Sequence, residues 1–164
     1  GSNLARIARA FDMTVIGVKR DPRSSAGGAD EVHGADRLMQ LLPRADIVAL
    51  TCPLTPETEN LIGPAALGVM KPTAHLVNVA RGRVVDEDAL IAALKAGRIA
   101  AAGLDVTREE PLPADSPLWA MPNVLLTPHC AGETRRYEDN VLDILVENLE
   151  RLWRGETGLR NEVV

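Results

Sequence analysis

Short aliphatic runs alternate with helical patterns along almost the whole of this 164-residue chain. The strand-like runs are rich in valine, isoleucine, leucine and alanine and cover residues 14–19, 46–51, 75–79, 100–106 and 123–127. The helical patterns cover residues 2–11, 36–42, 86–96 and about 134–154. Strands separated by helices need crossover connections, which produce a parallel sheet. The sequence therefore predicts an α/β protein with a doubly wound parallel sheet.

The composition of the core and the start of the chain refine this prediction. Aromatic residues make up only 2 % of the chain, so aliphatic side chains must fill the core, as suits parallel strands between helices. The first helical pattern starts at residue 2 with no strand before it. We therefore expect a sheet that lacks its first strand, in a chain that is a fragment of a longer protein. Ligands of such sheets bind beyond the carboxyl ends of the strands.

Charge, cysteine content and the lack of certain motifs limit the classes of partner and ligand that we expect for this protein. A formal net charge of −5 argues against nucleic acid, because binding to a phosphate backbone needs a basic face. Cys52 and Cys130 lie far apart and form no CxxC pair, which is typical of a reduced, cytoplasmic protein. No apolar run reaches the roughly 18 residues of a membrane span, so no membrane partner is expected. The chain has no HxxxH, HExxH or Cys/His cluster, so no metal site is expected either.

Gly1 and the pair Lys19 and Arg20 lie where a dinucleotide-binding fold contacts its cofactor. A glycine-rich turn before a helix cradles the pyrophosphate, so Gly1 is either the last glycine of a GxGxxG turn or a cloning remnant. An acid at the end of the next strand would bind the ribose of NAD, but this chain has two cations there and Asp21 one place later. A guanidinium suits the 2′-phosphate of NADP, so NADP is favoured over NAD. Solvated surface charge is the alternative.

The next two strands are followed by segments that could contact a cofactor or a substrate. Thr51, Cys52 and Pro53 begin a loop that two prolines hold extended, and this loop is either a wall for a riboside or a rigid turn. Ala80 and Arg81 follow the third strand and precede a glycine. A planar, two-pronged guanidinium at that place suits a substrate carboxylate, and a surface salt bridge is the alternative.

The last two strands end in groups that can hold or transfer a proton. Asp105 lies at the tip of the fourth strand, and Glu110 lies in the acidic loop after it. His129 follows the fifth strand, and histidine is the side chain best suited to exchange a proton near pH 7. Taken alone, each of these residues could be structural. His33, in an expected loop, and His75, at the start of a strand, are interpreted as structural.

Four stretches together resemble the D-isomer-specific 2-hydroxyacid dehydrogenase family along nearly the whole chain. They occur in the order and spacing of the family and read CPLTPETENLI, LVNVARGRVVDEDALIAAL, AAAGLDVTREEPL and NVLLTPHCAGET. The resemblance implies a Rossmann-like, NAD(P)-binding domain with Arg81, Glu110 and His129 as catalytic residues. It also implies that Asp105 lies near the nicotinamide and that Gly1 is the third glycine of the cofactor turn. Glyoxylate or hydroxypyruvate reductases and phosphoglycerate dehydrogenases are the branches that it suggests.

The resemblance further implies a reaction. A small 2-oxo acid binds near Arg81, a hydride passes between NAD(P)H and its carbonyl carbon, and His129 exchanges the proton with the oxygen. Glu110 orients His129 and keeps it protonated. The Lys19–Arg20 pair departs from the acidic residue of NAD-using members. The alternative function, from another class, is a nucleotide-sensing regulatory protein without turnover.

The resemblance also bears on domains and assembly. Residues 1–164 correspond to the NAD(P)-binding domain, and the helix at about 134–154 is expected to pack toward a substrate domain that this chain lacks. We therefore expect the chain alone to bind cofactor weakly and to turn over little. The family is usually dimeric, so a homodimer is expected on that ground alone.

Overall fold

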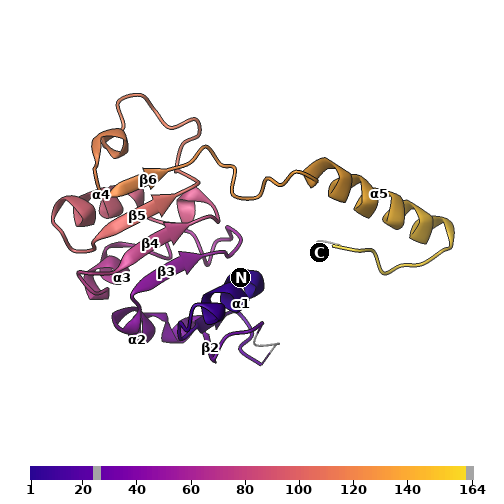
Figure 1. Cartoon of the computed structure of the whole chain (residues 1–164), viewed down its shortest axis with the longest axis horizontal. Coiled ribbons are helices and arrows are strands. Elements are labelled where there is room, and N and C mark those ends of the chain that lie inside the picture. Colours follow the sequence, from indigo (N-terminus) through magenta and orange to yellow (C-terminus); the bar gives the residue numbers. More distant parts are fainter. Residues whose placement is uncertain (24–26, 162–164) are drawn as a thin grey trace. The chain divides into compact units, whose positions relative to one another are not determined.

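The computed structural model describes residues 1–23 and 27–161, which form two compact units, Gly1–His129 and Cys130–Val164 (Figure 1). The strands are β1 (Ile16–Lys19), β2 (Glu31–Gly34), β3 (Ile47–Leu50), β4 (His75–Asn78), β5 (Ala101–Leu104) and β6 (Val124–Leu126). The helices are α1 (Ser2–Ala10), α2 (Leu38–Leu41), α3 (Pro64–Val69), α4 (Glu87–Lys95) and α5 (Tyr137–Trp153). Each unit is described separately.

The strands of the first unit form two parallel sheets, which confirms the predicted α/β class. β1 pairs with β2, and the second sheet has the order β3-β4-β5-β6. A doubly wound sheet of the order 3-2-1-4-5-6 has its first strand between the strands that correspond here to β1 and β3. Among the described residues no strand occupies that place, which agrees with the expected lack of a first strand.

Two parts of the N-terminal region differ from the prediction. His33 was expected in a loop but lies in β2, whose sequence EVHG has too few apolar residues to be recognised as a strand. β2 forms because its backbone pairs with β1, and ladder hydrogen bonds do not depend on side-chain type. The helix expected over 36–42 is a single α-helical turn, α2, between two 3-10 turns. Pro43 lies in the second turn and has no N–H to continue an α-helix.

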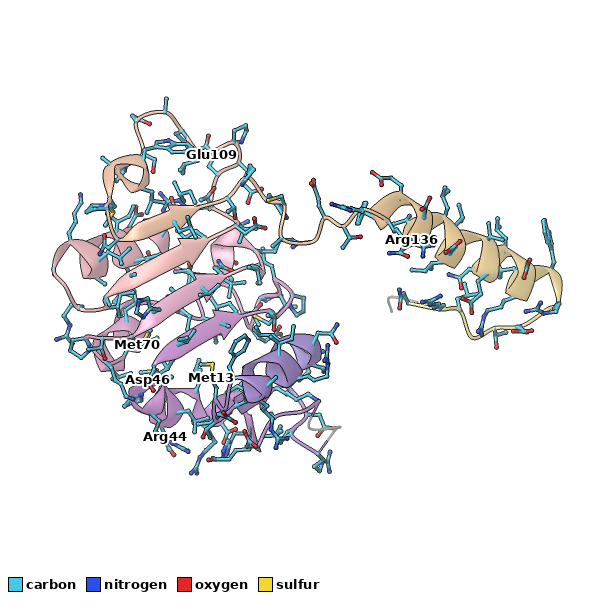
Figure 2. All side chains as sticks on the ribbon, in the orientation of Figure 1. Met13, Arg44, Asp46, Met70, Glu109 and Arg136 are labelled. Atoms are coloured by element: carbon cyan, nitrogen blue, oxygen red, sulfur yellow. The ribbon has the colours of Figure 1, made fainter. Side chains whose placement is uncertain are left out.

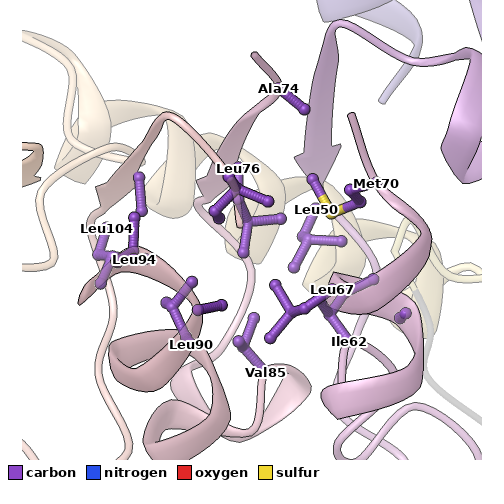
Figure 3. Close-up of a cluster of buried hydrophobic side chains, with 14 of the residues drawn as sticks. Leu50, Ile62, Leu67, Met70, Ala74, Leu76, Val85, Leu90, Leu94 and Leu104 are labelled. Atoms are coloured by element: carbon purple, nitrogen blue, oxygen red, sulfur yellow. The ribbon is translucent and has the colours of Figure 1, made fainter. Parts of the chain in front are cut away.

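The core of the first unit lies between the four-stranded sheet and the helices α3 and α4 (Figure 3). Leu50, Leu76 and Leu104 project from three neighbouring strands toward α3 and α4, which bury Leu67 and Leu90 against them. The ends of α4 are those that the sequence predicted. Its N-cap side chain, Asp86, accepts a hydrogen bond from the amide of Ala89, and Gly97 ends the helix with φ +65°.

The second unit consists of residues 130–136, α5 and the segment that follows it. The tail returns along one side of the helix, where Asn148 Nδ2 donates to the carbonyl of Arg160 and Arg151 donates to that of Gly158. The tail leaves the apolar stripe of the helix uncovered: no described residue of α5 is buried, and Val141, Leu145, Leu149 and Leu152 are all exposed. Figure 2 shows the side chains of this helix, which begins after the labelled Arg136. Packing of this helix toward a substrate domain stays a prediction.

Candidate functional site

The predicted site residues of the first unit lie at one edge of the sheet. All four strands of the larger sheet are parallel, so the segments after β3, β4, β5 and β6 leave from the same side (Figure 1). Two cavities open along this edge. One has a volume of about 520 Å³ and is bordered by the segments after β3 and β4, and the other, of about 580 Å³, by those after β5 and β6.

The first cavity brings together five of the predicted residues. Its walls are Thr51, Cys52, Pro53, Leu54, Val79, Ala80 and Arg81. Thr58 fixes the first wall, because its hydroxyl donates to the carbonyl of Pro53 at 2.7 Å and accepts from the amide of Thr55 at 2.8 Å. Burial raises the pKa of the Cys52 thiol, so this residue is a neutral part of the wall.

The N-terminal residues approach the same loop. A methyl group added at Gly1 would lie 3.3 Å from the hydroxyl oxygen of Thr51, which places the start of α1 beside this cavity. Arg20 directly follows β1. The pKa of Glu57 is lowered by a hydrogen bond with the side chain of Thr55, and the charge of Arg20 lowers it further. Arg20 is not among the residues that line the cavity.

Arg81 lines the first cavity, and its loop contacts the segment that borders the second. Its guanidinium donates to the carbonyl of Ala80 at 2.6 Å, so the side chain turns back over its own loop. The next residue, Gly82, lies directly against the segment after β5: a methyl group there would be 1.9 Å from the carbonyl oxygen of Thr107. Only glycine allows the Arg81 loop to approach the Glu110 loop this closely.

Glu110 and His129 form a hydrogen-bonded pair in the second cavity. Glu110 Oε2 lies 2.7 Å from Nδ1 of His129, and Glu110 Oε1 accepts from the amide of Thr107 at 3.1 Å. Burial alone would raise the pKa of Glu110, but the bonds from His129 and Thr107 and the nearby charges of His129 and Arg81 outweigh it and lower that pKa. Glu110 is therefore an ionised acceptor for the imidazole.

The backbone of His129 is also unusual. Its φ of +56° lies in the left-handed region, which few residues other than glycine adopt. Such conformations occur preferentially at functional sites, where the surrounding structure enforces them. The side chain of His129 is 46 % exposed, so the ring is accessible from the cavity.

Asp105 is the buried acid of the second cavity. It is only 6 % exposed, and its carboxylate accepts a hydrogen bond from the hydroxyl of Thr127 at 2.5 Å. The same cavity is lined by the apolar side chains of Leu112, Trp119 and Leu126. The indole nitrogen of Trp119 donates to the carbonyl of Pro113 at 2.9 Å, which fixes the ring.

Several residues at this edge were not predicted from the sequence. Thr107 contributes through its backbone amide, which leaves no signal in a sequence. Trp119 lies on an irregular 3-10 turn with no periodic pattern. Thr127 and Asn78 had a usable signal, since each is a polar residue at the carboxyl end of a strand.

The site fits a bound dinucleotide better than a metal ion. Two loops after neighbouring strands enclose a cavity of nucleoside size at the carboxyl edge, where α/β proteins bind nucleotides. The start of α1 lies beside it at Thr51. In residues 1–23 and 27–161, no group of three or more His, Cys, Asp or Glu side chains could hold a metal ion.

No helix in that part of the chain has the length and apolar character needed to cross a membrane.

Comparison with known sequences agrees with the family resemblance of the four sequence stretches. Residues 1–131 match the family model described as the NAD-binding domain of the D-isomer-specific 2-hydroxyacid dehydrogenases. A glyoxylate reductase of Korarchaeum cryptofilum is 42 % identical over 159 residues, which are 95 % of this chain and 47 % of the relative. The glyoxylate/hydroxypyruvate reductase B of Yersinia enterocolitica is 44 % identical over 152 residues, or 91 % of this chain and 46 % of the relative. The chain thus spans about half the length of the curated relatives that it matches.

A solved structure agrees with the sequence comparisons. It is the D-isomer-specific 2-hydroxyacid dehydrogenase of Xanthobacter autotrophicus in complex with NADPH and MES, which superposes with a TM-score of 0.84 at 42 % identity. The match covers 93 % of this chain and 61 % of that one.

Proposed function

This chain belongs to the D-isomer-specific 2-hydroxyacid dehydrogenase family, and we propose that the protein transfers a hydride between NAD(P)H and a small 2-oxo acid. The observation that carries the proposal is the 2.7 Å contact between Glu110 and His129, in a cavity next to the Arg81 loop. An acid–base group with an ionised orienting partner beside a cation is what reduction of a 2-oxo acid requires.

His129 is proposed as the general acid in the direction of reduction. With Nδ1 donating to Glu110, the other ring nitrogen, Nε2, can give its proton to the oxygen of the substrate carbonyl. The hydrogen bond with Glu110 fixes the orientation of the ring. In oxidation the same nitrogen accepts the hydroxyl proton, so one residue serves both directions.

Arg81 is proposed to bind the substrate. Its guanidinium can accommodate the carboxylate and lies close enough to Glu110 to affect the pKa of that residue. Substrate held by Arg81 would therefore lie near the Glu110–His129 pair. The positive charge also offsets the charge that develops on the carbonyl oxygen during reduction.

The nucleotide is proposed to lie along the carboxyl edge. Thr51, Cys52, Pro53 and Ala80 would flank it in the first cavity, Asp105 would face its nicotinamide end, and Gly1 would lie near its phosphates. When bound, a reduced nicotinamide supplies the hydride that the carbonyl carbon accepts. Lys19 and Arg20 would bind a 2′-phosphate, which makes NADP(H) the preferred cofactor. The related Xanthobacter enzyme was solved with NADPH.

Glyoxylate and hydroxypyruvate are the first substrates to test, because relatives at 42 % and 44 % identity are reductases named for them. A homodimer is proposed as the assembly. The decisive experiment measures oxidation of NADPH and NADH with each 2-oxo acid, using the protein in its full natural length. We expect turnover with NADPH preferred. Tight nucleotide binding without turnover on any 2-oxo acid would contradict the proposal and indicate a nucleotide sensor instead.

A further inference from the structure

Asn78 is a fully buried polar side chain at the carboxyl end of β4. It has 0 % exposure, like Leu76 two residues earlier on the same face of the strand. Burying an amide costs free energy unless its donor and acceptor are both used. Among the described residues only Asp105 shares this combination of polarity and burial, and it lies in the candidate site.

Both ends of the Asn78 amide bind the loop that carries Arg81. Its oxygen, Oδ1, accepts from the amide of Ala80 at 3.0 Å, and its Nδ2 donates to the carbonyl of Arg81 at 3.0 Å. Side chains of this type commonly replace backbone partners in tight turns. The two bonds hold the Val79–Ala80 and Arg81–Gly82 peptide units, which lie before Ala80 and after Arg81. Because the backbone is held at both ends of this pair of residues, the direction in which the Arg81 side chain leaves it is restricted.

The same loop is fixed on its other side by the Glu110 segment. Gly82 lies against the carbonyl of Thr107, and the amide of Thr107 donates to Glu110 Oε1. Glu110 in turn contacts His129. The segment from Asn78 to Gly82 is therefore held between the core of the sheet and the residues that support the Glu110–His129 pair.

We propose that Asn78 is a positioning residue that sets the place of Arg81 relative to Glu110 and His129. It does not touch substrate, and its effect on catalysis passes through Arg81. The inference rests on the proposed function, because it assumes that Arg81 binds the carboxylate of a 2-oxo acid. Burial of the Asn78 amide costs free energy, and both of its hydrogen bonds are made to the Arg81 loop. The inference therefore adds a residue that holds this loop in place.

The test uses the full-length protein with glyoxylate and NADPH. In Asn78→Asp the oxygen that accepts from Ala80 is kept, but the donor to Arg81 is replaced by a second acceptor. We expect kcat/KM for glyoxylate to fall by about 10- to 100-fold, chiefly through a higher KM, since small displacements of a binding group have effects of this size. Asn78→Ser, which removes the amide without adding a charge, should have a similar effect.

Asn123→Asp is the matched control. Asn123, which is partly buried, also donates from its side-chain amide to a backbone carbonyl, that of Ala100, at 3.2 Å. It precedes β6 and lies at the amino edge, away from the site. We expect wild-type kcat and KM from this variant. A loss equal to that of Asn78→Asp would show a general effect of the substitution and overturn the inference.

A double-mutant cycle with Arg81→Gln separates positioning from a structural role. If Asn78 acts through Arg81, then Asn78→Asp should cause little further loss once Arg81 is replaced. Full additivity would overturn the inference. If the wild type does not turn over glyoxylate, or if Arg81→Gln is as active as the wild type, both the proposed function and this inference are overturned. Should both Asn78 variants fail to fold, hydrogen exchange of the wild type decides: an unprotected Ala80 amide contradicts the hydrogen bond on which the inference depends.

Discussion

The four-stranded sheet and the N-terminal pair β1–β2 are held by different interactions. The buried core cluster runs from Leu42 to Leu118 and joins β3, β4 and β5 to α3 and α4. Neither β1 nor β2 contains a buried residue, and α1 buries only Ala5 while Phe11 is 76 % exposed. The N-terminal region instead has surface ion pairs, Arg9 with Asp30 at 3.2 Å and Arg44 with Glu31 at 2.6 Å.

This difference coincides with a division of tasks in the proposed reaction. Arg81, Glu110 and His129 project from loops that the core holds in place, and catalysis requires that kind of precision. Lys19 and Arg20, which are proposed to select the cofactor, lie in the region held by exposed ion pairs. Substitutions in the two regions should therefore have effects that differ in kind and in size.

The largest effect is expected from the proposed acid. His129→Gln removes the group that exchanges the proton, so kcat should fall by about 10²- to 10⁴-fold while nucleotide binding is kept. Steady-state kinetics and fluorescence titration with NADPH measure the two quantities. His75→Gln is the control, because His75 starts β4 at the opposite edge of the sheet and should leave kcat unchanged. A small effect of His129→Gln would contradict its assignment as general acid.

The comparison of the two regions can be tested through their stability. Leu76→Ala removes a side chain of 0 % exposure from the core, so the free energy of unfolding should fall by about 2–5 kcal/mol. Ile16→Ala in β1 removes a half-buried side chain and should cost less than half as much. Chemical denaturation of both variants gives the two values. Equal losses would mean that the N-terminal sheet is as tightly packed as the other one.

Cofactor choice should respond to the end of β1. Arg20→Ser removes a charged donor proposed to bind the 2′-phosphate, so the preference for NADPH over NADH should fall by about tenfold or more. The ratio of the kcat/KM values for the two cofactors measures this. Lys95→Ser, in the last turn of α4, changes the net charge equally and should leave the ratio unaltered. An unchanged ratio in Arg20→Ser would mean that Arg20 is solvated surface charge and does not select the cofactor.

The smallest effect is expected from Glu31 as pH falls. Hydrogen bonds from Arg44 and His33 lower its pKa from 4.5 to about 2 in the folded protein. The stabilisation is therefore fully present above pH 4.5 and is lost as the pH falls toward 2. NMR titration of the Glu31 carboxyl should show the low midpoint, and Arg44→Gln should raise it. A midpoint near 4.5 in the wild type would show that these ion pairs do not hold the N-terminal sheet.

The sequence by itself determined the fold class and the candidate site residues. The order of aliphatic runs and helical patterns implied a parallel sheet, because such connections allow little else. Arg81, Asp105 and His129 could be selected because each lies within three residues after the end of a strand, and those ends meet at one edge. The ends of α4 were also readable, since capping by Asp86 and Gly97 is a local property.

Only the tertiary structure decided how these residues meet. The 2.7 Å contact of Glu110 with His129, and the approach of Gly82 to Thr107, join segments that are far apart in the chain. β2 exists because of its partner strand, and the apolar stripe of α5 is exposed because burial requires a neighbour that no pattern within a helix supplies. Asn78 was readable as a polar residue in a strand, but its task depends on which backbone groups the fold brings to its amide. The periodicity of a sequence indicates the secondary structure that one segment prefers. The distances between segments are instead fixed by packing of the whole unit.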